Sequence, residues 1–146
     1  MKEKASENIK LLNFVYQNAE MGTISIVDIE ELVDNSNLEN ILNKQKEEYE
    51  NIMDTATQIY VAYGHDSASV GAIPKISTYI MIKAKTVKNK NSDILAKMLI
   101  ESSNKGIVAI TKELNNNQVD DQEIIRLAQN LLEIEKQNIE DLTPFL

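Results

Sequence analysis

The sequence contains no cysteine, and this absence removes several kinds of site at once. A disulfide framework, a thiolate nucleophile and cysteine-based zinc or iron–sulfur centres are all excluded. Glycine and proline are also rare, with four and two residues in a chain of 146. Because these residues interrupt helices, their scarcity allows long uninterrupted helices and argues against an all-β fold.

Positive charge is scarce as well. The chain has 15 Lys and Arg against 23 Asp and Glu, for a net charge of −8. Binding to nucleic acid and to anionic membrane surfaces depends largely on basic residues, so neither partner is expected. Arg126 is the only arginine, which leaves few means of clamping a phosphate through two parallel hydrogen bonds.

Long hydrophobic runs are missing too. No apolar run approaches the roughly 18 residues of a membrane-spanning helix. The first twenty residues are charged and then amphipathic, without the apolar core of a signal peptide. A cytoplasmic protein is therefore expected, and a chain of this length is expected to form a single domain over residues 1–146.

Apolar residues recur at helical spacing in four long segments, which predicts four amphipathic helices. The segments cover approximately residues 4–33, 37–63, 93–114 and 121–142. Pro74 suits the first turn of a shorter helix over residues 74–87, and Gly64 suits the end of the second long helix. Ser36 and Glu39 fit a capping box before that helix, and Ser92 fits the N-cap of the third long one.

The connections between these segments predict how the helices are arranged. The first and second long helices are separated by a short turn, and so are the third and fourth, which favours two antiparallel hairpins. About thirty residues, 64–92, lie between the hairpins, enough to run from one end of a bundle to the other. Two hairpins joined by one long crossover is the connectivity of a ferritin-like bundle.

Polar residues interrupt the apolar stripe of two expected helices. In LLEIEKQNIEDL, residues 131–142, Glu135 and Asn138 share a face with Leu131 and Leu142. In the second segment, Gln45 and Glu48 lie on the inward stripe in the same way. Carboxylates and amides that face a core need a partner, an ion or water.

With this helix order and these polar pairs, the chain resembles the ferritin-like superfamily, most closely small bacterial members with an extra crossover helix and a degenerate di-iron motif. The resemblance implies an all-α, ferritin-like four-helix bundle. In metal-binding members, two helices each supply a Glu and the other two each supply Glu-x-x-His. The positions that match this pattern are Glu20, Glu101, the pair Gln45 and Glu48, and the pair Glu135 and Asn138.

Both histidine positions of that pattern hold other residues, Glu48 and Asn138, and the only histidine, His65, lies in a loop. Di-iron chemistry is therefore not expected. The four residues of the two pairs are interpreted as a polar plug, in which the Gln45 and Asn138 amides donate to the Glu48 and Glu135 carboxylates. Two carboxylates placed close together would raise the pKa of one of them.

Two other interpretations remain open. Glu20, Glu48, Glu101 and Glu135, helped by Gln45 and Asn138, could together bind a metal ion; oxygen ligands of this kind suit Mn²⁺, Mg²⁺ or Ca²⁺, and the resemblance implies Fe or Mn. Without such a site no cofactor is expected. A small molecule could instead occupy the bundle interior beside Gly22 and Gly106, where small residues leave room.

No arrangement of nucleophile and base is visible, and no glycine-rich loop follows a strand, so no catalytic residue is assigned. The function predicted is that of a non-catalytic binding or scaffold protein, which the resemblance connects with stress or dormancy. A homodimer is expected, with Ile80 and Ile82 as candidate contacts. The alternative is a carboxylate-rich metal-binding protein or oxidoreductase.

Overall fold

The computed structural model describes residues 2–71, 91–116 and 118–146. It contains four long helices. Two single 3₁₀ turns, η1 (Ser67–Ser69) and η4 (Thr143–Phe145), accompany them, and no strand occurs in the described ranges. The predicted all-α class is confirmed. The expected helix over 74–87, with Ile80 and Ile82, lies outside the described residues. The long helices are α1 (Lys2–Glu30), α2 (Ser36–Ala62), α3 (Ser92–Leu114) and α4 (Gln122–Leu142).

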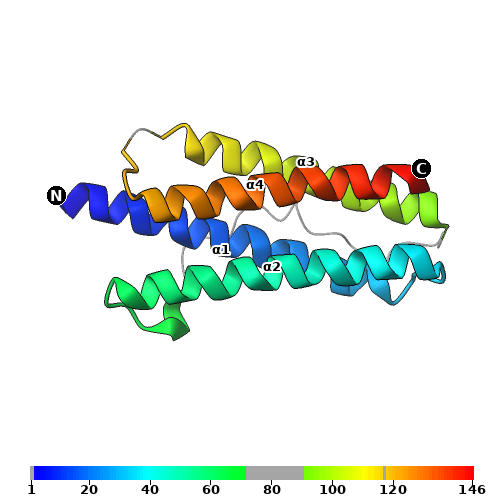
Figure 1. Ribbon diagram of the computed structural model, residues 1–146, viewed down its shortest axis with the longest axis horizontal. Helices are drawn as coiled ribbons and strands as arrows, with labels where there is room; N and C mark the ends of the chain where they lie inside the picture. Colours follow the sequence, from blue (N-terminus) through cyan, green and yellow to red (C-terminus); the bar gives the residue numbers. More distant parts are fainter. Residues whose placement is uncertain (1, 72–90, 117) are drawn as a thin grey trace.

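The helices pack as two antiparallel hairpins, α1 with α2 and α3 with α4 (Figure 1). α2 ends at one end of the bundle and α3 begins at the opposite end (Figure 1). This is the predicted four-helix bundle with one long crossover. Among the described helices, no stretch is both long and apolar enough to pass through a bilayer.

The core lies along the axis of the bundle, where the apolar stripe of each helix meets the other three. The predicted stripes of α3 and α4 are largely correct: Leu95, Leu99, Ile124 and Leu131 are all buried. Burial of side chains this size contributes about 1.5–3 kcal/mol each. The largest fully buried side chains come from all four helices: Leu11, Leu12, Ile26, Ile29, Leu38, Leu42, Ile52, Leu95, Ile110, Ile124, Leu131 and Leu142.

The helix ends differ from the predictions in two places. The N-cap of α2 is Asn35, whose side chain accepts hydrogen bonds from the amides of Asn37 and Leu38, so the predicted capping box at Ser36 is wrong. The N-cap of α3 is Asn91 and Ser92 is already helical. Because Asn and Ser are equally good N-caps, the sequence does not distinguish neighbouring candidates.

α1 is more polar inside than the spacing predicted, and its buried amides fasten other segments to the bundle. Asn13 accepts from the amide of Gly71, and Gln17 donates to the carbonyl of Gly71. Gly71 has φ +76°, and the Tyr16 ring leaves no room for a side chain there. Asn8 forms hydrogen bonds with Asp120 through both of its side-chain polar atoms. These bonds hold the segment that follows α2 and the segment that precedes α4 against α1.

Candidate functional site

The most distinctive feature of the interior is a group of polar side chains halfway along the bundle. Tyr49 comes from α2, Ser103 from α3, and Glu135 and Asn138 from α4, and we call these four residues the polar centre. Their exposed fractions are 3%, 6%, 2% and 1%. Glu135 and Asn138 share one face of α4 because residues three apart lie on the same side of a helix.

Hydrogen bonds connect these side chains across the two hairpins. The Tyr49 hydroxyl donates to Glu135 Oε2 at 2.8 Å, and Asn138 Nδ2 donates to the Tyr49 oxygen at 3.0 Å. The Ser103 hydroxyl is a hydrogen-bond partner of both Tyr49 and Glu135. Every member of the polar centre therefore has a protein partner, which removes most of the penalty for burying polar atoms.

Two glycines make room for this arrangement. A Cβ on Gly22 of α1 would lie 2.5 Å from Tyr49 Cζ, and one on Gly106 of α3 would lie 3.0 Å from Glu135 Oε1. Asn18 donates to the Gly106 carbonyl at 3.3 Å. The interior space expected beside these glycines is therefore filled, by the Tyr49 ring and by the Glu135 carboxylate.

Burial controls the ionisation of the polar centre. It raises the pKa of Glu135 to about 7, although the hydrogen bonds from Tyr49 and Ser103 oppose the rise. Burial also raises the pKa of Tyr49 well above its usual value, and the neighbouring Glu135 charge adds to the effect. The predicted rise in a carboxyl pKa does occur, but its cause is loss of water contact instead of a second carboxylate.

Comparison with known proteins agrees with this architecture. A bacterial structure, the dodecameric thioferritin that is a bacterioferritin-related protein from Bacteroides fragilis, superimposes with a TM-score of 0.71 over 99% of this chain and 89% of that one. The chain described here therefore has a ferritin-like fold. The two sequences are only 12% identical, so the likeness extends to the fold alone. No protein-family model matches the sequence, and no curated protein does.

The ferritin-like fold allows the predicted carboxylates to be placed one by one. Glu135 is buried, whereas Glu20 is half-buried and Glu101 is exposed. The Glu48 side chain is 29% exposed and pairs with Lys44 on its own helix at 3.9 Å. In the described part of the chain, no three Asp, Glu, His or Cys side chains come together as metal ligands would. Metal binding by the four glutamates stays a prediction.

The residues of the polar centre do not fit the di-iron site of metal-binding ferritin-like proteins. That site uses four Glu and two His side chains from four helices. Here one carboxylate reaches the centre, and a phenol, an amide and a hydroxyl take the other inward positions. The Tyr49 ring also packs directly against the backbone of Gly22. The Tyr49 hydroxyl and the Asn138 amide both direct hydrogen-bond donors into the centre.

Sequence reasoning missed Tyr49, Asn18 and Ser103. It placed Gln45 opposite the α4 pair, but Gln45 Nε2 has no hydrogen-bond partner in the described structure. On α1 the inward polar residue at this height is Asn18, two positions before Glu20, and on α3 it is Ser103, two positions after Glu101. The useful signal was the pair of glycines inside long helices, since each marks a bulky neighbour.

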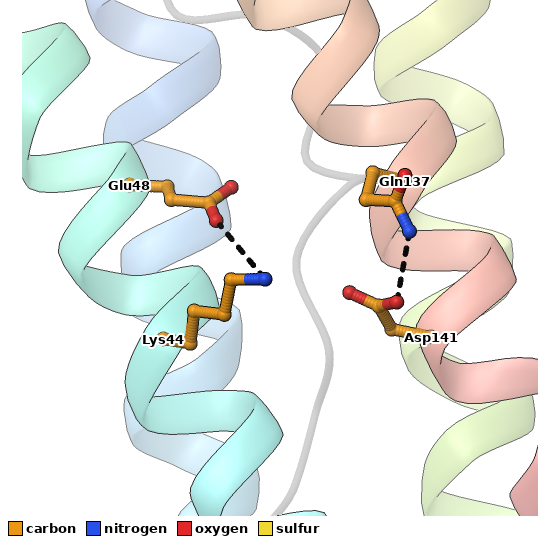
Figure 2. A network of polar contacts seen from close by, with 4 residues as sticks. All are labelled: Lys44, Glu48, Gln137 and Asp141. Atoms are coloured by element: carbon orange, nitrogen blue, oxygen red, sulfur yellow. Dashed lines mark hydrogen bonds and ion pairs between the residues drawn. The ribbon is translucent and has the colours of Figure 1, made fainter.

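Glu48 contributes instead to a surface groove of about 380 Å³ between α2 and α4. Figure 2 shows Lys44 and Glu48 on α2 facing Gln137 and Asp141 on α4. Partial burial raises the pKa of Glu48, Lys44 lowers it, and Asp141 and Glu47 raise it further. The groove is lined by Glu48, Asn51, Ile52, Thr55, Asn130 and Ile134.

Proposed function

We propose that this protein is a non-catalytic ferritin-like bundle that acts by binding or association, and that its polar centre takes the structural place of a di-iron centre. The observation that carries the proposal is the bond from the Tyr49 hydroxyl to the buried Glu135 carboxylate. Through this bond the Tyr49 hydroxyl occupies the Glu135 carboxylate, which would otherwise be available to bind a metal ion. We propose a cytoplasmic setting, consistent with the composition.

The packing around the polar centre supports this proposal. The Tyr49 ring lies against Gly22 and the Glu135 carboxylate lies against Gly106, so each bulky group sits opposite a residue without a side chain. Asn138 donates to the same Tyr49 oxygen and orients it. Because each of these side chains contacts another protein group, the polar centre has no side-chain atom left open to bind a metal ion. Such a centre stabilises the pairing of the two hairpins.

Metal analysis tests the proposal directly. We expect protein purified without chelator to contain no stoichiometric metal, and its melting temperature to stay the same when Fe²⁺ (under anaerobic conditions), Mn²⁺ or Zn²⁺ is added. A ligand that binds only the folded state has to raise that temperature. Elemental mass spectrometry measures the metal content, and thermal melting measures the change in melting temperature.

The opposite result would favour the alternative, a carboxylate-rich metal-binding protein or oxidoreductase that uses Fe or Mn. Stoichiometric metal that is lost in Glu48→Ala/Glu135→Ala would assign ligands to that set. The matched control is Glu47→Ala/Glu133→Ala, which removes two exposed carboxylates from the same helices. Metal lost equally in both variants would indicate non-specific binding to an acidic surface.

Association with other copies of the chain is the second part of the proposal. Two features support it: the structurally similar thioferritin is a dodecamer, and Val108 on α3 is 68% exposed. We expect a homodimer. Light scattering coupled to size-exclusion chromatography at micromolar concentration checks the mass, and a monomer would contradict this part of the proposal.

A further inference from the structure

Two polar side chains inside the bundle lack the hydrogen-bond partners that the polar centre has. Ser25 on α1 and Gln45 on α2 are 1% and 3% exposed. Ser25 Oγ and Gln45 Nε2 are both shielded and find no partner atom among the described residues. Leaving a buried polar atom unpaired costs roughly a five- to hundredfold factor in the folding equilibrium. Two such atoms in one core call for a common explanation.

Helical spacing puts these two side chains in one layer of the bundle. Gly22 contacts the Tyr49 ring, Ser25 follows Gly22 by one turn, and Gln45 precedes Tyr49 by one turn. Because α1 and α2 are antiparallel, both steps lead from that contact toward the 31–35 connection (Figure 1). Ser25 and Gln45 therefore lie on adjacent helices in the layer next to the polar centre.

The surroundings of this layer restrict what it can hold. On the side toward the connection, Ile29 and Leu42 are fully buried and apolar. On the other side lie Tyr49 and the Glu135 carboxylate of the polar centre. An anion would be repelled by that carboxylate when it is ionised, and a cation would face the two N–H donors of Gln45. A small neutral molecule that both donates and accepts hydrogen bonds satisfies the chemistry.

We propose that Ser25 and Gln45 bind an internal water molecule between α1 and α2, which accepts from Gln45 Nε2 and exchanges a hydrogen bond with Ser25 Oγ. Water is the smallest neutral species with this donor and acceptor pattern, and buried waters typically bind to otherwise unsatisfied polar groups. The site is separate from the Tyr49–Glu135 bond and does not depend on the function proposed above.

A double-mutant cycle tests the shared water in solution. Ser25→Ala, Gln45→Met and the double variant are compared with wild type by urea unfolding. With a bridging water, the two changes are coupled by about threefold or more in the folding equilibrium constant, and Gln45→Met does not increase that constant. A Gln45 side chain without a partner would give the reverse: replacement by methionine would stabilise the protein about fivefold or more. Additive effects or a stabilising Gln45→Met overturn the proposal.

Gln17→Met is the matched control, because Gln17 Nε2 is equally buried but donates to the Gly71 carbonyl at 2.6 Å. Its replacement is expected to lower the folding constant about fivefold or more. If the Ser25 or Gln45 variants do not fold, a crystal structure of the wild-type protein decides. An ordered water within hydrogen-bonding distance of both Oγ and Nε2 supports the proposal, and a layer closed by direct side-chain contact, or holding an ion, overturns it.

Discussion

The Tyr49 hydroxyl donates a 2.8 Å hydrogen bond to the Glu135 carboxylate, and that bond joins residues 86 positions apart in the sequence. It crosses from the first hairpin to the second at a point where all four helices contribute to the interior. Both groups are almost completely buried. The bond therefore adds to the apolar core in holding the two hairpins together.

Replacing Tyr49 by phenylalanine removes only the hydroxyl. Glu135 Oε2 and Asn138 Nδ2 then lose their partner, and we expect the free energy of unfolding to fall by about 1–3 kcal/mol. Urea unfolding at pH 6 measures the change. Tyr63→Phe is the control, because the Tyr63 hydroxyl bonds Asp121 at an exposed site and its loss is expected to cost less. Equal losses in both variants would contradict a special role for Tyr49.

Stability is expected to fall as the pH rises, through Glu135. Its pKa is about 7 in the folded protein and 4.5 as the ordinary reference, so the folded state binds the proton more tightly than the unfolded state. The resulting stabilisation is fully present below about pH 4.5 and is lost as the pH rises through about 7. The slope is at most about 1.4 kcal/mol per pH unit.

The comparison that isolates this effect is wild type against Glu135→Gln between pH 5 and 8. The glutamine cannot ionise, so the difference in unfolding free energy between the two proteins should change by roughly 2.5 kcal/mol across the range. Other acidic groups contribute equally to both proteins and cancel. A constant difference would mean that Glu135 ionises in the folded protein as it does in water.

Gly22→Ala is expected to destabilise the protein, although alanine usually favours a helix by about 1 kcal/mol over glycine. The added Cβ would lie 2.5 Å from Tyr49 Cζ, so the ring has to move and its bond to Glu135 is strained. Combining Gly22→Ala with Tyr49→Leu should recover part of the loss in thermal melts.

Gly64→Ala is the contrasting control for Gly22. Gly64 has φ +91° and no neighbour within 4 Å of an added Cβ, so its cost comes from the backbone, about 1–2 kcal/mol. Tyr49→Leu should not relieve it. If Tyr49→Leu recovered the same amount of stability in Gly22→Ala and in Gly64→Ala, the contact between Gly22 and Tyr49 would be unimportant.

The charges beside the groove between α2 and α4 predict opposite shifts of the Glu48 pKa in two variants. Lys44 lowers the pKa of Glu48 and Asp141 raises it. We therefore expect Lys44→Ala to move the Glu48 pKa upward and Asp141→Asn to move it downward. Carbon-13 NMR titration of the glutamate carboxyl groups follows both shifts. Identical directions in the two variants would show that Glu48 does not face both charges.

The sequence reached much of this fold because helical periodicity is a local property. Stripes of apolar residues predicted four long helices, and connection lengths predicted two hairpins with one crossover. Glu135, Asn138 and Gln45 were placed inside correctly, since each lies in the middle of its stripe. Glu20, Glu48 and Glu101 lie at stripe edges, where one residue corresponds to about 100° of rotation. Their positions therefore needed the neighbouring helices.

The sequence by itself determined which residues form helices and that a polar group would be buried in α4, because both follow from the spacing of side chains along one helix. Only the tertiary structure decided that the partner of Glu135 is Tyr49 and that Gly22 and Gly106 accommodate the pair. The physical reason is that the axial and rotational register between helices is a property of packing, and no residue encodes it alone.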